Sequence, residues 1–187
     1  MGQTRAELEQ APGAIPAPAQ AIITLLNSRP HATPLTSDLL DGDEADTILR
    51  PFTDPSGEPP SRCSALERAR QLRGDLVAVL EAPDDAAVAW AQLTEHAADI
   101  TLGYTFTGPA QAAVRRISGE PVVGGITAAV ADLIRSGKWA RIRLCANDQC
   151  RHAFYDTTRS RTQRWHSYEV CGNRHNAAAY RARRSAR

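Results

Sequence analysis

Apolar side chains recur every three or four residues along three stretches of the chain, at 61–81, 83–97 and 121–135. This spacing places them on one face of a helix, which can then cover a hydrophobic core. Prolines stand where the second and third of these helices would begin, as helix starts allow. We therefore predict three core helices, with one or two acidic helical turns at 43–49 among several prolines.

Between the second and third helices the period of the pattern changes from 3.6 residues to two. Apolar side chains alternate with polar or small ones over 100–107, which predicts a half-buried strand or a hairpin. Helical character returns at about 109–117, and we expect a short helix there. After the third helix, residues 138–144 are expected to form a strand that leads into the first pair of cysteines.

The chain divides into three parts by composition. Residues 1–20 are rich in proline and alanine and hold few large apolar groups, so a flexible lead-in is expected. Residues 21–140 carry the helical patterns, and 187 residues suffice for one domain with a buried core and a small appendage. Residues 141–187 form that appendage.

The appendage holds four potential zinc ligands at matched spacing: Cys145 and Cys150, then His166 and Cys171. Each pair encloses four residues and fifteen separate the pairs, giving C-x4-C-x15-H-x4-C. Two short-range pairs of sulfur and nitrogen donors can converge on one tetrahedral ion, so we predict one structural Zn²⁺. His152 competes with His166 for the fourth place, but its position two residues after Cys150 would distort the spacing.

The same ligand set argues against catalysis and against an oxidising compartment. Four protein donors leave no position for water or substrate, and no glycine-rich phosphate loop is present, so no enzyme activity is expected. Clustered cysteines with an interleaved histidine favour metal binding over disulfides. No stretch approaches the roughly 20 apolar residues that cross a bilayer, and no signal pattern begins the chain. We therefore expect a cytoplasmic protein with no membrane partner.

Charge is distributed unevenly between the two parts. Residues 1–140 carry 11 basic and 18 acidic residues, a formal charge of −7, whereas residues 141–187 carry 11 arginines and 3 acids, a charge of +8. Arginine suits phosphate contact, which predicts nucleic-acid binding, with docking on the acidic domain or simple solubility as alternatives. A solvated basic tail remains an alternative from Arg181 onward. The candidate contacts are Arg159, Arg161, Arg164, Arg174, Arg181, Arg183 and Arg184.

Several neighbours of the ligands are expected to support the module. Phe154, Tyr155 and Trp165 are the large groups from which so small a unit would build its core. Asp156 is expected to accept a hydrogen bond from an arginine or from His166, or else to occupy an exposed turn. Asn173 is expected to cap the following helix or bond back to the knuckle.

Residues 141–184 resemble a CGNR-type zinc finger. The resemblance is carried by the Cys-Ala-Asn start, the Phe-Tyr-Asp strand, the arginine-rich turn, the Trp and the Cys171-Gly172-Asn173-Arg174 signature. His166 stands where that family usually has a cysteine. The fold class expected is mainly α (α+β): a helical N-terminal domain with a short β-hairpin, followed by a small treble-clef-like zinc module.

The layout of the whole chain also resembles bacterial proteins that join an N-terminal ABATE domain, here about 18–140, to this finger. That family is described as stress-induced transcriptional regulators. The resemblance implies a DNA-binding regulator whose helical domain senses a small-molecule or protein effector, or forms a homodimer. The alternative is a protein–protein interaction module whose finger docks on a partner or on its own acidic domain.

Overall fold

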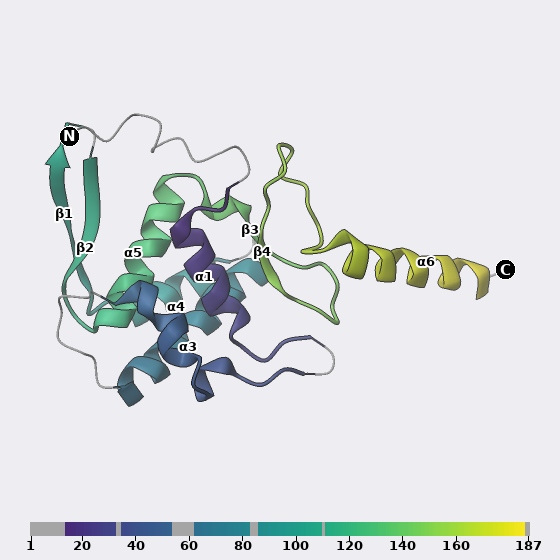
Figure 1. Cartoon of the computed structure of the whole chain (residues 1–187), viewed down its shortest axis with the longest axis horizontal. Coiled ribbons are helices and arrows are strands. Elements are labelled where there is room, and N and C mark those ends of the chain that lie inside the picture. The colour runs from purple at the N-terminus through teal and green to yellow at the C-terminus, as the bar shows by residue number, and fades with distance from the viewer. Residues whose placement is uncertain (1–13, 33–34, 54–61, 83–85, 110, 186–187) are drawn as a thin grey trace.

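The computed structural model describes residues 14–32, 35–53, 62–82, 86–109 and 111–185. A helical body lies between a long β-ribbon at one end and the zinc-binding module at the other, and the last helix projects away from the body (Figure 1). The helices are α1 (Ala17–Asn27), α2 (Ala45–Leu49), α3 (Arg62–Glu81), α4 (Ala87–His96), α5 (Pro121–Arg135) and α6 (Asn173–Ser185). Short 3₁₀ turns occur at η2 (Leu39–Asp41), η3 (Arg50–Phe52) and η5 (Trp139–Arg141), with a π-helical turn at η6 (Tyr168–Gly172). The strands are β1 (Thr101–Gly108), β2 (Gln111–Ser118), β3 (Ile142–Leu144) and β4 (Ala153–Tyr155).

The predicted core helices are confirmed as α3 and α5, and the acidic turn as α2. The second predicted helix is α4, which begins at Ala87; residues 83–85 of that prediction lie outside the described residues. The lead-in expected over 1–20 extends too far, because α1 begins at Ala17 and buries Ala19. Its first part, 1–13, lies outside the described residues.

The short helix expected at 109–117 is wrong, because residues 111–117 belong to β2, which pairs antiparallel with β1; residue 110 lies outside the described residues. Tyr104 faces Val114 and Phe106 faces Ala112 across the ribbon. Alanine and arginine favour a helix locally, but an alternating strand needs a partner for its backbone N–H and C=O groups. Pairing therefore overrides local propensity here. The strand expected over 138–144 is shorter, since η5 occupies its first half.

The hydrophobic core is shared between the helical body and the β3–β4 hairpin. α1, α3 and α5 contact one another around fully buried side chains such as Leu25, Leu76 and Ile126. β4 packs on α1 and β3 packs on α3, which places Ile142 and Ala153 in the same core. The hairpin is therefore part of the main core, and a boundary between residues 140 and 141 does not separate two cores.

Asn27, the last residue of α1, docks the outer edge of β4 through its side-chain amide. Its Oδ1 accepts the backbone N–H of Ala153 at 2.7 Å, and its Nδ2 donates to the carbonyl of the same residue at 2.9 Å. These two bonds satisfy backbone groups that a third strand would otherwise pair. A side chain thus takes the place of a strand at this edge.

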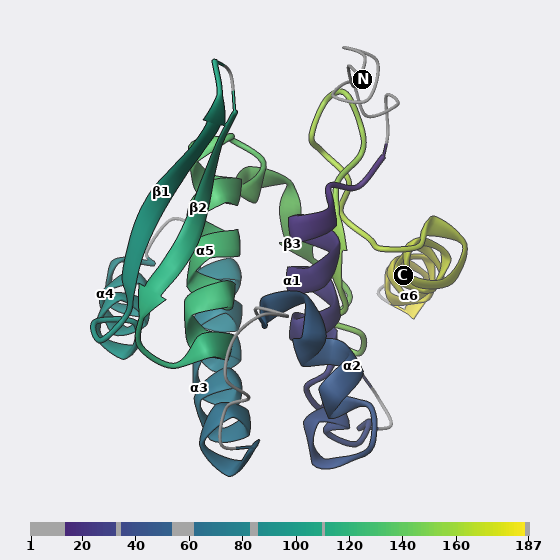
Figure 2. The same cartoon turned by 60° about the vertical axis from the view of Figure 1, so that its left-hand side comes forward.

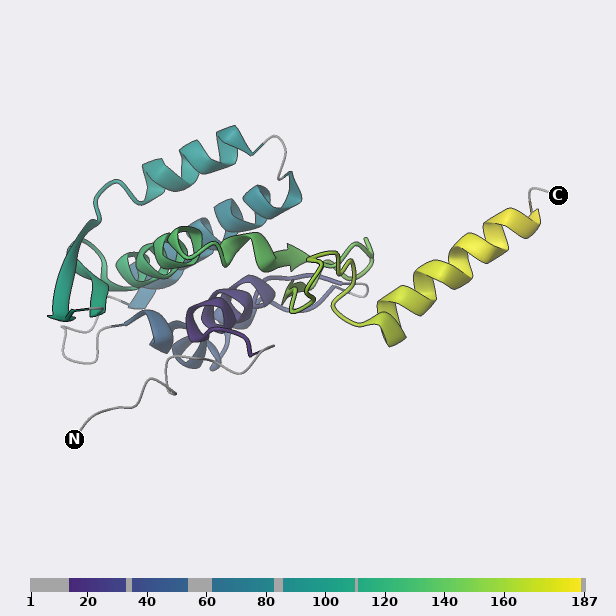
Figure 3. The same ribbon diagram turned by 90° about the horizontal axis from the view of Figure 1, so that it is seen from above.

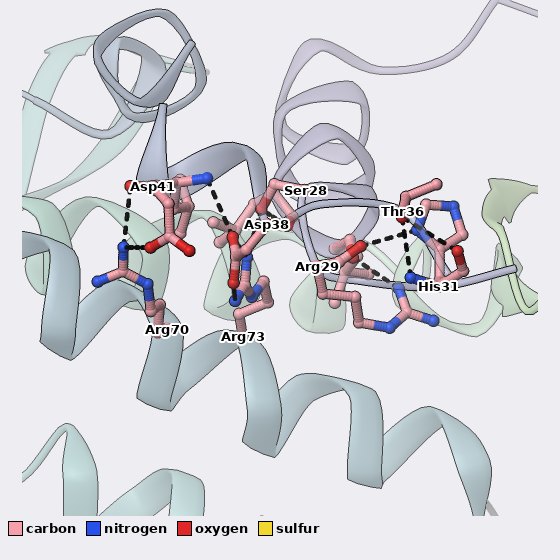
Figure 4. Close-up of polar contacts among 11 residues, drawn as sticks. Ser28, Arg29, His31, Thr36, Asp38, Asp41, Arg70 and Arg73 are labelled. Carbon is pink, nitrogen blue, oxygen red and sulfur yellow. Dashed lines mark hydrogen bonds and ion pairs between the residues drawn. The ribbon is translucent and has the colours of Figure 1, made fainter. Parts of the chain in front are cut away.

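One buried and one exposed ion pair fasten the segment after α1 to α3 (Figure 4). The guanidinium of Arg73 donates to both carboxylate oxygens of Asp38 and to Ser28 Oγ, and all three residues are largely buried. The hydrogen bond from Arg73 holds the pKa of Asp38 below its usual value despite the burial. One helical turn away on α3, Arg70 binds a single carboxylate oxygen of the exposed Asp41 and also donates to the carbonyl of Leu40. This loop leads into η2 and α2, so these pairs position the N-terminal half of the core.

Gly125 on α5 allows η3 to approach this helix closely. A β-carbon there would lie 2.0 Å from the carbonyl oxygen of Phe52 in η3. The neighbouring Gly124 faces the Arg116 side chain on β2, so the two glycines that weaken this helix in sequence allow η3 and the ribbon to pack on it. Gly74 on α3 is the contrasting case, since a β-carbon there meets nothing within 4 Å.

We predict opposite effects of Gly→Ala substitution at these two positions. Gly125→Ala should destabilise the protein by about 1–3 kcal/mol, because η3 must move to relieve the clash. Gly74→Ala should stabilise it by about 0.5–1 kcal/mol through helix propensity alone. Urea unfolding followed by circular dichroism measures both, and equal free energies of unfolding would contradict the packing of η3 on α5.

Candidate metal centre

The first ligand pair lies at the turn of the β3–β4 hairpin. Cys145 directly follows β3, and its N–H donates to the carbonyl of His152 across the hairpin at 2.8 Å. Asn147 shapes the turn: its carbonyl accepts the N–H of Cys150 at 2.8 Å, and its side chain accepts that of Gln149. The chain therefore forms a compact knuckle that brings both thiols to one side.

The second pair spans the start of the C-terminal helix. Ser167, one residue after His166, accepts the N–H of Val170 on its hydroxyl and that of Cys171 on its carbonyl. These bonds begin the π-helical turn η6, which continues into α6. A knuckle, a hairpin and a helix that supplies the second ligand pair form the treble-clef-like arrangement.

The ligand atoms of Cys145, Cys150, His166 and Cys171 all lie within 4.8 Å of one another. Three sulfurs and one imidazole nitrogen at this separation fit one tetrahedral zinc ion. Cys145 and Cys171 are almost fully buried, whereas Cys150 and His166 are half-buried. Burial, together with the neighbouring thiols, raises the pKa of Cys150 to about 12, so zinc must displace its proton on binding. The donor set matches a closed structural site.

His166, and not His152, belongs to this cluster. His166 Nδ1 lies 3.4 Å from the sulfur of Cys150 and 3.8 Å from that of Cys171. The ring of His152 packs against His166, but its Nε2 lies 3.0 Å from the Asn27 amide and its Nδ1 lies 3.3 Å from His31. Burial lowers the pKa of His152 to about 4, with His166 and His31 adding to the effect. A neutral His152 therefore supports the junction with α1.

Asp156 organises the loop between the ligand pairs from a fully buried position. It accepts hydrogen bonds from the N–H and hydroxyl of Thr158, from Gln163 N–H, and from Arg143 at 3.4 Å. Burial alone would raise the pKa of Asp156, but the bonds from Thr158 and Gln163 outweigh it and hold the pKa below its usual value. The expectations of an exposed turn residue and of a bond from His166 are both wrong, whereas an arginine partner is present.

The other expected supporting residues differ in where they pack, and Tyr155 belongs to the main core instead of a separate core of the module. Phe154 is buried, and Tyr155 packs against the main core. Trp165 is half-buried, with the guanidinium of Arg164 5.2 Å from its ring and Tyr168 against its edge. The side chain of Asn173 donates to the carbonyl of Glu169 at 3.0 Å, which ties the first residue of α6 to the turn η6 before it.

The predicted arginines occupy two exposed groups. Arg159, Arg161 and Arg164 lie on the loop between the ligand pairs. The remainder, Arg174, Arg181, Arg183 and Arg184, lie along α6. A groove of about 550 Å³ runs between α6 and the knuckle, with Arg174 and Arg181 on one wall and residues 146–149 on the other.

Sequence patterns missed the residues that join the centre to the helical body. Asn27 docks β4, and the guanidinium of Arg29 donates to the carbonyl of Arg151 at 2.6 Å. Arg151 in turn binds Glu81 at the end of α3. The one available signal was that three polar residues, Asn27, Ser28 and Arg29, follow the apolar stretch of α1. That signal does not identify a partner more than 100 residues away.

Residues 141–184 match the CGNR zinc finger family. A search of curated proteins found no match for the chain. Among the described residues, no helix combines the length and apolar character needed to cross a membrane. The family match and the converging ligands together support zinc binding by this segment.

We predict that either an imidazole or a thiolate at position 166 can serve as the fourth zinc ligand. His166→Cys should retain zinc, because a thiolate can replace the imidazole, whereas His166→Ala should weaken binding at least about tenfold. His152→Ala is the matched control and should leave zinc affinity within a few-fold of the parent protein. Competition with a chromophoric chelator measures all three, and unchanged affinity in His166→Ala would remove His166 from the centre.

We also predict that losing the ion releases only part of the module. Cys171→Ser should expose η6, α6 and the loop at 157–167, because zinc contributes on the order of 10 kcal/mol to organising them. β3 and β4 should stay protected, since the main core and Asn27 hold them.

Amide hydrogen exchange distinguishes the two segments, with Cys63→Ser, an exposed cysteine outside the cluster, as the control. Equal exchange of β4 and η6 in Cys171→Ser would contradict this division. Full protection of the η6 amides in the zinc-free protein would also contradict it.

Proposed function

We propose that this protein is a zinc-dependent DNA-binding regulator, in which the finger contacts phosphate groups and the helical body receives the signal. The observation that carries the proposal is the position of α6. It projects from the body (Figures 1 and 3). Its described side chains are exposed, and four of them are arginines. A helix that served only to cover a core would bury an apolar face.

The charge of α6 supports a polyanionic partner. Its sequence from Asn173 to Ser185 contains no carboxylate. Arg174, Arg181 and Arg184 follow one another at steps of seven and three residues, which places them on one side of the helix. The loop that holds Arg159 and Arg164 lies between the two ligand pairs, so the same ion organises both groups of arginines. Phosphate contact from such a surface would be largely independent of base sequence.

The structure bears on the alternative in which the finger docks on its own acidic domain. That contact is made by the hairpin, chiefly through Asn27 and the apolar core, and an ion pair joins Arg151 to Glu81. The described arginines of α6 and of the loop are exposed. This arrangement favours an external partner for them.

We predict a steep loss of DNA affinity as salt rises. If about six arginines contact phosphates, log K should fall against log salt with a slope of roughly −5 on random-sequence duplex. Replacing Arg174, Arg181 and Arg184 with Gln should weaken binding at low salt and reduce the steepness of that slope by roughly 2–3.

The control is an equal loss of charge outside the finger, with Arg50, Arg115 and Lys138 replaced by Gln. Fluorescence anisotropy with the zinc-loaded protein measures all three forms. Zinc-loaded protein that fails to bind DNA at low salt, or the same slope in both triple variants, would overturn the proposal and favour a protein partner.

A further inference from the structure

A cavity of about 440 Å³ lies between the helical body and the zinc module, away from the zinc ligands and from the exposed arginines of α6 and of the loop at 157–167. Its walls come from α3, α4, η5 and β3, so it opens where the two parts of the chain meet. Its size is within the range of sites for small molecules. The lining residues that matter here are Val79, Leu80, Trp90, Trp139, Arg143 and Leu144.

Two of the three tryptophans of the chain lie side by side in this cavity. The ring centroids of Trp90 and Trp139 are 5.7 Å apart, and the planes are tilted by 60°. Both rings are only half-buried, so each keeps aromatic surface that a flat occupant can cover. Val79 and Leu80 add aliphatic surface from α3. This combination favours a flat aromatic ring system.

The polar end of the cavity is basic. Among the described residues that line it, Arg143 alone carries a charge. Its guanidinium is held in place by Asp156 and by the carbonyl of Arg161, to which it donates at 2.8 Å. Arg141 donates to the backbone carbonyl of Asp156, so two guanidinium groups lie beside a residue that carries a single negative charge. The positive charge that remains favours an anionic occupant.

From these features we infer that the cavity binds a small, flat aromatic anion, with its ring against Trp90 and Trp139 and its charged group at Arg143. The inference goes beyond the proposed DNA contact. It rests on the proposed regulatory function only in treating the cavity as an effector site. Arg143 also holds the carbonyl of Arg161, so an occupant touches a side chain that positions the arginine loop.

The test uses the full zinc-loaded chain with 2-naphthoate, and 2-naphthamide as a neutral probe of the same shape. Calorimetry should show one binding site for 2-naphthoate. The affinity for 2-naphthamide should be at least about tenfold lower, the factor expected from losing one charged hydrogen bond. In proton–nitrogen NMR spectra the indole signals of Trp90 and Trp139 should shift. Trp165, in the finger, serves as the internal control.

Two variants separate the ring contact from the charge contact. Trp90→Leu should weaken 2-naphthoate at least about tenfold while keeping the cavity apolar. Arg143→Gln should abolish the preference for carboxylate over amide, a ratio that a general loosening of the finger would not selectively remove. Val88→Ala, on the exposed side of α4, should leave binding unchanged.

Unmoved Trp90 and Trp139 signals at millimolar 2-naphthoate would overturn the inference, as would equal affinity for the amide. Because no step uses DNA, failure here leaves the proposed DNA contact untouched. Failure of the DNA experiment equally leaves this binding test intact.

Discussion

The pairing of Asn27 with β4 is the contact on which the arrangement of the two parts depends. It joins the end of the first core helix to the hairpin that carries Cys145 and Cys150. Because the hairpin is also buried in the main core, the first half of the metal centre is held before any ion binds. The metal then has to organise only the second half.

This division explains why a small module can carry an extended helix. α6 contacts η6 but packs on no other described element to a comparable extent. Its direction is therefore set by the second ligand pair and by the Ser167 cap, which directly follows the ligand His166. A centre with one imidazole in place of a thiolate keeps the tetrahedral geometry and is one charge less negative.

Figure 2 shows the opposite end of the molecule, where β1 and β2 extend along α5.

The fold could be predicted from sequence where local patterns decided it, and not where distant partners did. The apolar stripes of α3 and α5 predict amphipathic helices because residues three and four positions apart lie on the same face of a helix. The segment 111–118 has a helical composition, yet it is a strand because β1 requires a partner. The glycines of α5 weaken a helix in isolation, and only the approach of Phe52 explains them.

The same distinction holds for the candidate site. By itself, the sequence determined the number, type and spacing of the zinc ligands, because two C/H-x4-C pairs describe local geometry. Only the tertiary structure showed that His166, and not His152, is the fourth ligand. It also showed that Asp156 is buried and that Arg143 lines a cavity together with two tryptophans. It also joined Asn27 to Ala153 across 126 positions of the chain. Contacts at that separation depend on how helices and strands pack, and no spacing within a short segment encodes them.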